Sequence, residues 1–94
     1  MTNDEIKNRL QQFIDKYSIK SIILFGSRAN GTNQDDSDVD LILEFYNPVS
    51  LIVLSEIKIE MEEVLNLDVD IVHGPVTEDD MLEIGEEVVL YAAA

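Results

Sequence analysis

Two aspartates that alternate with apolar residues constrain this chain more than any other feature. The segment Ser37-Asp38-Val39-Asp40-Leu41 continues as Ile42-Leu43-Glu44, with apolar residues at every second position from Val39. That period predicts a β-strand, on which side chains two residues apart project from the same face. We therefore expect Asp38 and Asp40 to lie together at the start of one strand. Carboxylates are unusual in an apolar strand, because a charge there is costly unless it is paired or bound to a metal.

A third aspartate, Asp70, lies between Val69 and Ile71 in an apolar segment, 67–72, that predicts another strand. Three carboxylates about 5 Å apart would repel by roughly 3 kcal/mol per pair at an effective dielectric near 20. A divalent cation offsets such repulsion, and oxygen ligands favour Mg²⁺ or Mn²⁺ over zinc. Asp68 is an alternative to Asp70, although it lies at the turn before the strand. Taken alone, two aspartates in an acidic protein can also mark a solvated strand end.

The segment Gly26-Ser27-Arg28 directly follows an apolar run, 19–25, that predicts a buried strand. A glycine at that position lets the backbone turn sharply and approach a ligand closely. The amides after it and the Ser27 hydroxyl are expected to contact phosphate oxygens, and Arg28 would add positive charge. The alternative interpretation is an ordinary turn with a surface arginine.

The remaining segments predict helices and strands around these motifs. Thr2 and Glu5 fit a capping box at the start of an amphipathic helix that ends at about Tyr17. A second helix is expected over about 49–66, a short helix from Thr77, and an edge strand over 88–91. This order predicts an α/β fold of the α+β type, a small mixed sheet packed against helices. We expect one domain over residues 1–91, with residues 92–94 as a tail.

Composition and charge exclude several classes of protein. The chain has 94 residues, which is enough for one domain, and it has no cysteine, so disulfides, zinc–thiolate sites and thiol catalysis are excluded. Its net charge of −14 argues against binding nucleic acid or an anionic membrane, and favours a basic protein partner. The acidic N-terminus is unlike a signal peptide, and no apolar stretch approaches the ~20 residues that span a bilayer. We therefore expect a cytoplasmic protein.

Taken together, these motifs resemble the signature of nucleotidyltransferases of the DNA polymerase β superfamily. The signature comprises a strand that ends in Gly26-Ser27, the segment 37–41, and a later strand that carries Asp70. The form G-S-R-A-x-G…S-D-x-D-L in so short a chain is similar to the minimal nucleotidyltransferases (MNT), which are antitoxins that act alongside HEPN-domain ribonuclease toxins. The resemblance covers essentially the whole chain and departs at Asn30, where many relatives have an arginine.

The resemblance implies the nucleotidyltransferase fold and a metal site. Asp38 and Asp40 would bind two Mg²⁺ ions. Asp70 would complete the metal site and help to deprotonate the attacking hydroxyl. These three aspartates are the implied catalytic residues.

The resemblance also implies the nucleotide site, the reaction and the partner. Ser27 and the Gly26 backbone would hold the β and γ phosphates of ATP, with Arg28 in support. A tyrosine hydroxyl of the HEPN toxin would attack the α-phosphate, which transfers AMP to the toxin and releases pyrophosphate. Because 94 residues leave no room for an acceptor lobe, we expect the toxin to complete the site in a hetero-oligomer.

Two other functions fit parts of the sequence. A catalytically weak antitoxin would neutralise a basic toxin by direct binding, which the negative charge and the departure at Asn30 favour. Nucleotidyl transfer to a small molecule or to RNA ends is less favoured, because it usually needs a further substrate-binding domain and because RNA conflicts with the charge.

Overall fold

Each of the two long helices begins at a hydroxyl side chain that caps its first turn. Helix α1, Asn3–Lys16, follows Thr2, whose side chain accepts a hydrogen bond from the Glu5 amide at 3.1 Å. Helix α3, Leu51–Leu65, follows Ser50, whose hydroxyl accepts from the Val53 amide at 3.2 Å. Such caps satisfy amides that have no partner within the helix.

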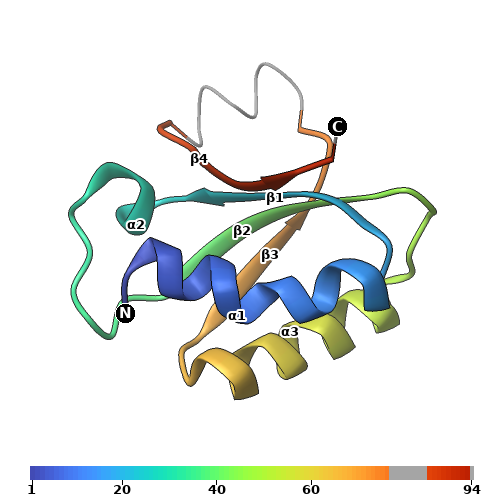
Figure 1. The fold of residues 1–94 in the computed structure, drawn as a ribbon, viewed down its shortest axis with the longest axis horizontal. Coiled ribbons are helices and arrows are strands. Elements are labelled where there is room, and N and C mark those ends of the chain that lie inside the picture. The colour runs from blue at the N-terminus through green and yellow to red at the C-terminus, as the bar shows by residue number, and fades with distance from the viewer. Residues whose placement is uncertain (77–84, 94) are drawn as a thin grey trace.

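The computed structural model describes residues 1–76 and 85–93, and in these residues four strands form one mixed sheet in the order β3-β2-β1-β4. Strands β1 and β2 pair antiparallel, as do β1 and β4, whereas β2 and β3 are parallel. Figure 1 shows α1 and α3 side by side on one face of this sheet. The strands are β1, Ile19–Phe25; β2, Val39–Phe45; β3, Val69–His73; and β4, Val88–Ala92. The mixed sheet with packed helices confirms the predicted fold class.

The core lies between the sheet and the two long helices. Alternate residues of β2 face this core, and they are fully buried together with apolar residues of α1 and α3. The alternation leaves the intervening Asp40 on the opposite face of the strand, partly exposed. Fully buried core residues include Ile6, Leu10, Val39, Leu41, Leu43, Ile57, Met61 and Val69. The pattern that builds the core therefore also places the acidic residues outside it.

Two strands begin or end at other residues than the sequence predicts, because apolar side chains also occur in turns and at chain ends. Strand β3 begins at Val69 rather than Leu67, because Asn66 ends α3 in the left-handed conformation and residues 67–68 complete the connection. Ala92 is the last residue of β4 rather than part of a tail, and the Ala93 amide donates to the Lys20 carbonyl at 3.0 Å. The short helix predicted from Thr77 lies outside the described residues.

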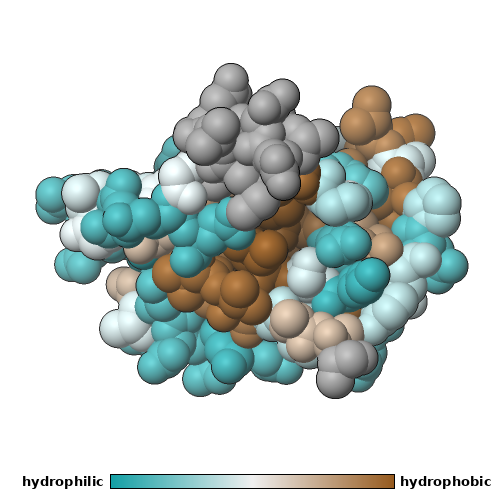
Figure 2. Space-filling model, turned by 90° about the horizontal axis from the view of Figure 1, so that it is seen from above, coloured by the Kyte–Doolittle hydropathy of each residue, from teal (hydrophilic) through white to brown (hydrophobic). Residues whose placement is uncertain are grey.

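Several large apolar side chains remain on the surface. Leu51 and Ile52 at the start of α3 are 81% and 75% exposed. Figure 2 shows that the face seen from above is a mixture of hydrophilic and apolar areas rather than uniformly hydrophilic. Within residues 1–76 and 85–93, none of the helices has the length and apolar character needed to cross a membrane.

Candidate functional site

Three neighbouring strands bring the predicted site residues to one edge of the sheet. Asp40 pairs with Asp70 across the parallel strands β2 and β3. On its other side Asp40 pairs with Phe25, the last residue of β1, which Gly26 follows. Paired residues on adjacent strands lie about 5 Å apart with side chains on the same face. Gly26, Asp40 and Asp70 therefore lie in a row, although they are far apart in the sequence.

Asp40 is the most electrostatically perturbed member of this group. Burial raises the pKa of the Asp40 carboxyl, and the charges of Asp70 and Asp38 and a hydrogen bond with Asp70 raise it further. Asp38 and Asp70 are exposed, whereas Asp40 is half-buried. The negative charges thus crowd around the central carboxylate, and a cation or a proton at this position would be favoured.

We expect the substitution Asp40→Asn to stabilise the metal-free protein at neutral pH. Because the folded-state pKa of Asp40 is raised, folding disfavours the ionised carboxylate, and stability is recovered as pH falls through that raised pKa. Asparagine carries no charge, so the variant should melt at a higher temperature than the wild type at pH 7.5, and the difference should shrink towards pH 4. Thermal denaturation at several pH values in EDTA measures this difference. A lower melting temperature for the variant at pH 7.5 would contradict the account.

Gly26 has no room for a side chain, because Asp40 occupies the space. A Cβ atom at Gly26 would lie 2.3 Å from Asp40 Oδ2. Its backbone has φ 74° and ψ −151°, a conformation adopted essentially only by glycine. The glycine thus allows the turn after β1 to pass directly against the Asp40 carboxylate. The sharp turn at Gly26 agrees with the sequence analysis, whereas the group that lies against it in the structure is the Asp40 carboxylate.

The turn after Gly26 is a four-residue helix, α2, Ser27–Asn30. Ser27 is half-buried at its start, next to the glycine that contacts Asp40. Asn30 closes the following loop, since its Oδ1 accepts from the Thr32 amide at 3.1 Å and from the Thr32 hydroxyl at 2.6 Å. Ser27 is the one residue of α2 with a hydroxyl side chain, and it directly follows the glycine that lies against Asp40.

Arg28 does not have the role that the sequence analysis gave it. Its side chain is only 3% exposed, and its guanidinium donates four hydrogen bonds to the backbone carbonyls of Met1, Asp35 and Ser37. Donors that already hold backbone carbonyls are not free to bind phosphate. The prediction of phosphate support, and the alternative of a surface arginine, are both wrong here. No sequence signal could have revealed this role, because the three acceptors are backbone carbonyls, which every residue type carries.

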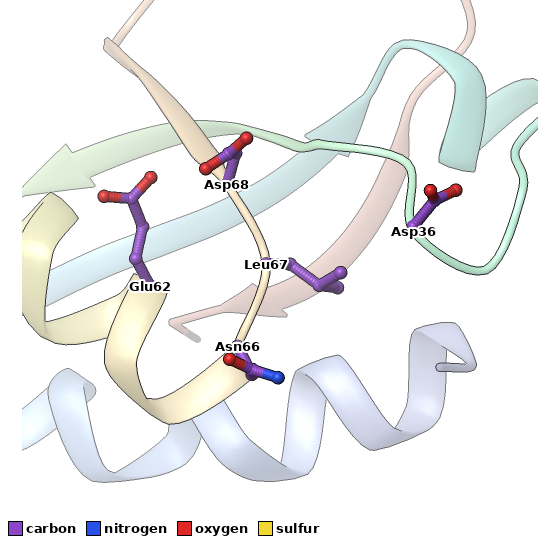
Figure 3. Close-up of a pocket in the computed structure, with 5 residues that line it drawn as sticks. All are labelled: Asp36, Glu62, Asn66, Leu67 and Asp68. Atoms are coloured by element: carbon purple, nitrogen blue, oxygen red, sulfur yellow. The ribbon is translucent and has the colours of Figure 1, made fainter.

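Asp68 lies directly before β3 and beside a cavity. It lines a cavity of about 370 Å³ with Asp36, Glu62, Asn66 and Leu67. Figure 3 shows Asp36, on the loop before β2, on the opposite side of this cavity from Glu62 and Asp68. The Asp68 carbonyl instead accepts from the Val39 amide at 2.8 Å, which ties the starts of β2 and β3 together. The residue beside Asp40 is Asp70, as its position within the predicted strand favours.

The site suits a cation that takes some of its ligands from a substrate. Among the residues that the structure describes, no three acidic, histidine or cysteine side chains are arranged to hold a metal ion by themselves. Mg²⁺ is usually bound through one or two carboxylates together with water and substrate phosphates, rather than by an all-protein cage. The adjacent carboxylates of Asp40 and Asp70, with Asp38 close by, fit that kind of ligation.

Comparisons with known proteins agree with this fold. The crystal structure of a toxin-antitoxin with AMP-PNP has a TM-score of 0.77 at 21% identity, covering 93% of this chain and 73% of that chain. A tri-AMPylated Shewanella oneidensis HEPN toxin in complex with MNT antitoxin gives a TM-score of 0.73 at 17% identity, covering 98% and 74%. At these identities the likeness establishes the nucleotidyltransferase fold, as predicted.

Sequence comparison establishes the family. The "Putative protein adenylyltransferase MJ0126" of Methanocaldococcus jannaschii is 35% identical over 75 residues, which cover 76% of each chain. The family model described as "Nucleotidyltransferase domain" matches residues 4–89, a range that contains every site residue discussed above. The chain therefore belongs to the nucleotidyltransferase domain family.

Proposed function

We propose that this chain is an antitoxin that transfers AMP from ATP to a tyrosine hydroxyl of a HEPN toxin and so inactivates the toxin. The observation that carries the proposal is the row of Gly26, Asp40 and Asp70 at one edge of the sheet. It sets a carboxylate pair directly against the glycine turn that begins α2. Family membership supports nucleotidyl transfer as the reaction.

The three aspartates would together form the protein part of the metal site. Asp38 and Asp40 would hold Mg²⁺, and Asp70 together with phosphate oxygens of ATP would complete its ligands. Bound Mg²⁺ would polarise the α-phosphate and neutralise charge on the attacking and leaving oxygens. Crowding among the carboxylates, which raises the pKa of Asp40, is relieved when a cation binds, so the metal-free site is the less stable state.

The proposed reaction needs no reactant other than ATP and the tyrosine hydroxyl. The tyrosine oxygen forms a bond to the α-phosphorus of ATP while the bond from that phosphorus to the bridging oxygen breaks. Pyrophosphate leaves, and Asp70 accepts the tyrosine proton. The Ser27 hydroxyl and the Gly26 backbone would hold the β and γ phosphates, on the β1 side of Asp40. Asp70 lies on the β3 side of Asp40, so the acceptor would approach from there.

The comparisons support the choice of substrate and partner. The Methanocaldococcus jannaschii relative has a name that refers to protein adenylylation. The two solved structures of the same fold are toxin–antitoxin assemblies, one with AMP-PNP and the other with a tri-AMPylated HEPN toxin. We extend adenylylation and a HEPN partner to this chain on these grounds.

Transfer of label from ATP tests the proposed reaction. The chain would be incubated with Mg²⁺, a cognate HEPN toxin, and ATP labelled at either the α or the γ phosphorus. We expect the toxin to acquire label from α-labelled ATP only, and none when EDTA is present. Label from γ-labelled ATP would indicate phosphoryl transfer, and no label from either would contradict the proposal.

Neutralisation by direct binding is the second candidate function, and the net charge of −14 favours it. The exposed apolar side chains of Leu51 and Ile52 offer a further contact area. This function predicts that Asp40→Asn still inhibits the toxin, and that inhibition weakens with added NaCl as the charges are screened. The adenylylation proposal instead predicts that Asp40→Asn fails to inhibit at any salt concentration. Measuring the ribonuclease activity of the toxin between about 50 and 500 mM NaCl separates the two candidate functions. Over this range the screening length falls from roughly 14 to 4 Å.

A further inference from the structure

Arg28 is the one charged side chain that is buried in the part of the chain the structure describes. Its Nη1 donates to the Met1 carbonyl at 3.0 Å and its Nη2 to the Asp35 carbonyl at 3.1 Å. Both Nε and Nη2 donate to the Ser37 carbonyl, at 3.2 and 2.9 Å. A buried charge is costly unless polar groups surround it, so this arginine and the three carbonyls depend on one another. Figure 1 shows the connection from α2 to β2 passing the N-terminus of the chain.

The Ser37 carbonyl belongs to the peptide group that directly precedes Asp38. The peptide group that follows Asp38 is also held, because the Val39 amide donates to the Asp68 carbonyl at 2.8 Å. Asp38 itself is exposed. Its carboxylate is therefore placed by the backbone on either side of it, and Arg28 supplies one of the two anchors.

Arg28 also belongs to the turn that carries Ser27. The Ser27 carbonyl accepts from the Thr32 amide at 3.0 Å, and the Gly26 carbonyl accepts from the Ala29 amide at 3.0 Å, so this turn is internally bonded. One short helix thus carries the hydroxyl proposed for the nucleotide and, one residue later, the guanidinium that holds the loop before Asp38. The two sides of the site are linked through a single side chain.

We propose that Arg28 is a positioning residue that fixes Asp38 relative to Ser27 and so sets the affinity of the site for the metal–nucleotide complex. The inference rests on the proposed function and adds to it a residue that does not touch the substrate. Arginine suits this role because its planar guanidinium presents five donors in a fixed geometry. Lysine keeps the charge, but its three donors lie on one flexible ammonium and cannot reach all three carbonyls in the same way.

Metal affinity is the direct test of this role. Mn²⁺ would be titrated by electron paramagnetic resonance in the presence of α,β-methylene-ATP, which cannot lose pyrophosphate. We expect Arg28→Met to raise the Mn²⁺ dissociation constant about tenfold, the range found when groups that orient a metal ligand are removed. Arg28→Lys should fall between this variant and the wild type. Arg9→Met is the matched control, because Arg9 is exposed and, among the described residues, its guanidinium makes one hydrogen bond, to the Val64 carbonyl at 3.4 Å. It should bind as the wild type does.

A double-mutant cycle separates positioning from general stability. If Arg28 acts through Asp38, Arg28→Met should weaken Mn²⁺ binding in the wild type but cause little further loss in an Asp38→Asn background. In an Asp36→Asn background, Arg28→Met should still raise the Mn²⁺ dissociation constant about tenfold. If Arg28→Met does not fold, Arg28→Lys takes its place in the cycle, and circular dichroism confirms that each variant is folded at the temperature used.

The outcomes are distinguishable. The positioning role would be overturned if Arg28→Met weakened Mn²⁺ binding equally in the wild-type and Asp38→Asn backgrounds, or if the folded variant bound Mn²⁺ as the wild type does. Either result would leave the proposed function intact. Absence of Mn²⁺ and nucleotide binding by the wild type would overturn the proposed function, and this inference with it. We expect Arg28→Met to weaken Mn²⁺ binding about tenfold in the wild type and hardly at all in the Asp38→Asn background.

Discussion

Asp40→Asn should reduce AMP transfer by about 1,000-fold while leaving the protein folded. The substitution removes the central carboxylate of the row and, with it, the cation that would stabilise charge on the reacting oxygens. Loss of about 4 kcal/mol of transition-state stabilisation corresponds to this factor. Asparagine has nearly the same shape, so the Gly26 turn and the pairing with Asp70 should remain. The rate of label transfer from α-labelled ATP measures the effect.

Asp36→Asn is the matched control for this experiment. It removes the same charge from an exposed residue on the loop before β2, and Asp36 lines the cavity across from Glu62 rather than pairing with Asp40. It should retain nearly full activity. Asp68→Asn should behave in the same way, whereas Asp70→Asn should not. Equal losses in Asp36→Asn and Asp40→Asn would show that net charge, and not the site, controls the reaction.

Gly26→Ala should both destabilise the protein and reduce AMP transfer by about 100-fold or more. The new methyl group would lie 2.3 Å from Asp40 Oδ2, so either the turn or the carboxylate must move. The backbone conformation also costs about 1–3 kcal/mol for any residue with a Cβ. A displacement of about 1 Å at a reacting group can itself reduce a rate 100-fold. Chemical denaturation gives the stability change, and label transfer gives the activity.

Gly31→Ala separates backbone strain from the clash. Gly31 also has a positive φ, +81°, but among the described residues, apart from its neighbours along the chain, no atom lies within 4 Å of the position that a methyl group would take there. Its substitution should therefore cost stability with little loss of activity. In an Asp40→Ala background the clash is relieved, and Gly26→Ala should then destabilise by no more than its backbone strain. An undiminished cost of Gly26→Ala in that background would mean that Asp40 does not occupy the space beside the glycine.

Local patterns are sufficient to predict most of the fold. The apolar run 19–25 coincides with β1, and Thr2 caps α1 as its spacing with Glu5 indicates. The alternation from Val39 correctly predicts a strand with Asp40 on the face away from the core. The prediction for β3 begins two residues too early, because Leu67 has the side chain of a strand residue but belongs to the turn after Asn66. Side-chain type alone does not reveal where a turn ends.

The pairing of distant residues can be predicted only in part. Aspartates in two predicted strands indicate a common site, and the sheet order then places Asp40 beside both Asp70 and the Gly26 turn. The environment of Arg28 could not be predicted, since it depends on where three carbonyl groups meet in space. A side chain that bonds to backbone carbonyls is hard to predict from the sequence, because every residue type provides such a carbonyl.

Mass spectrometry of a cognate HEPN toxin tests the central claim most directly. The toxin, taken from among the products of genes beside the one for this chain, would be incubated with the chain, Mg²⁺ and ATP, and then weighed intact and sequenced by fragmentation. The account predicts mass increments of one or more AMP units, located on tyrosine and absent with the Asp38→Asn, Asp40→Asn double variant. An unmodified toxin that is nevertheless inhibited and co-elutes with the chain would contradict it, and would establish neutralisation by binding instead.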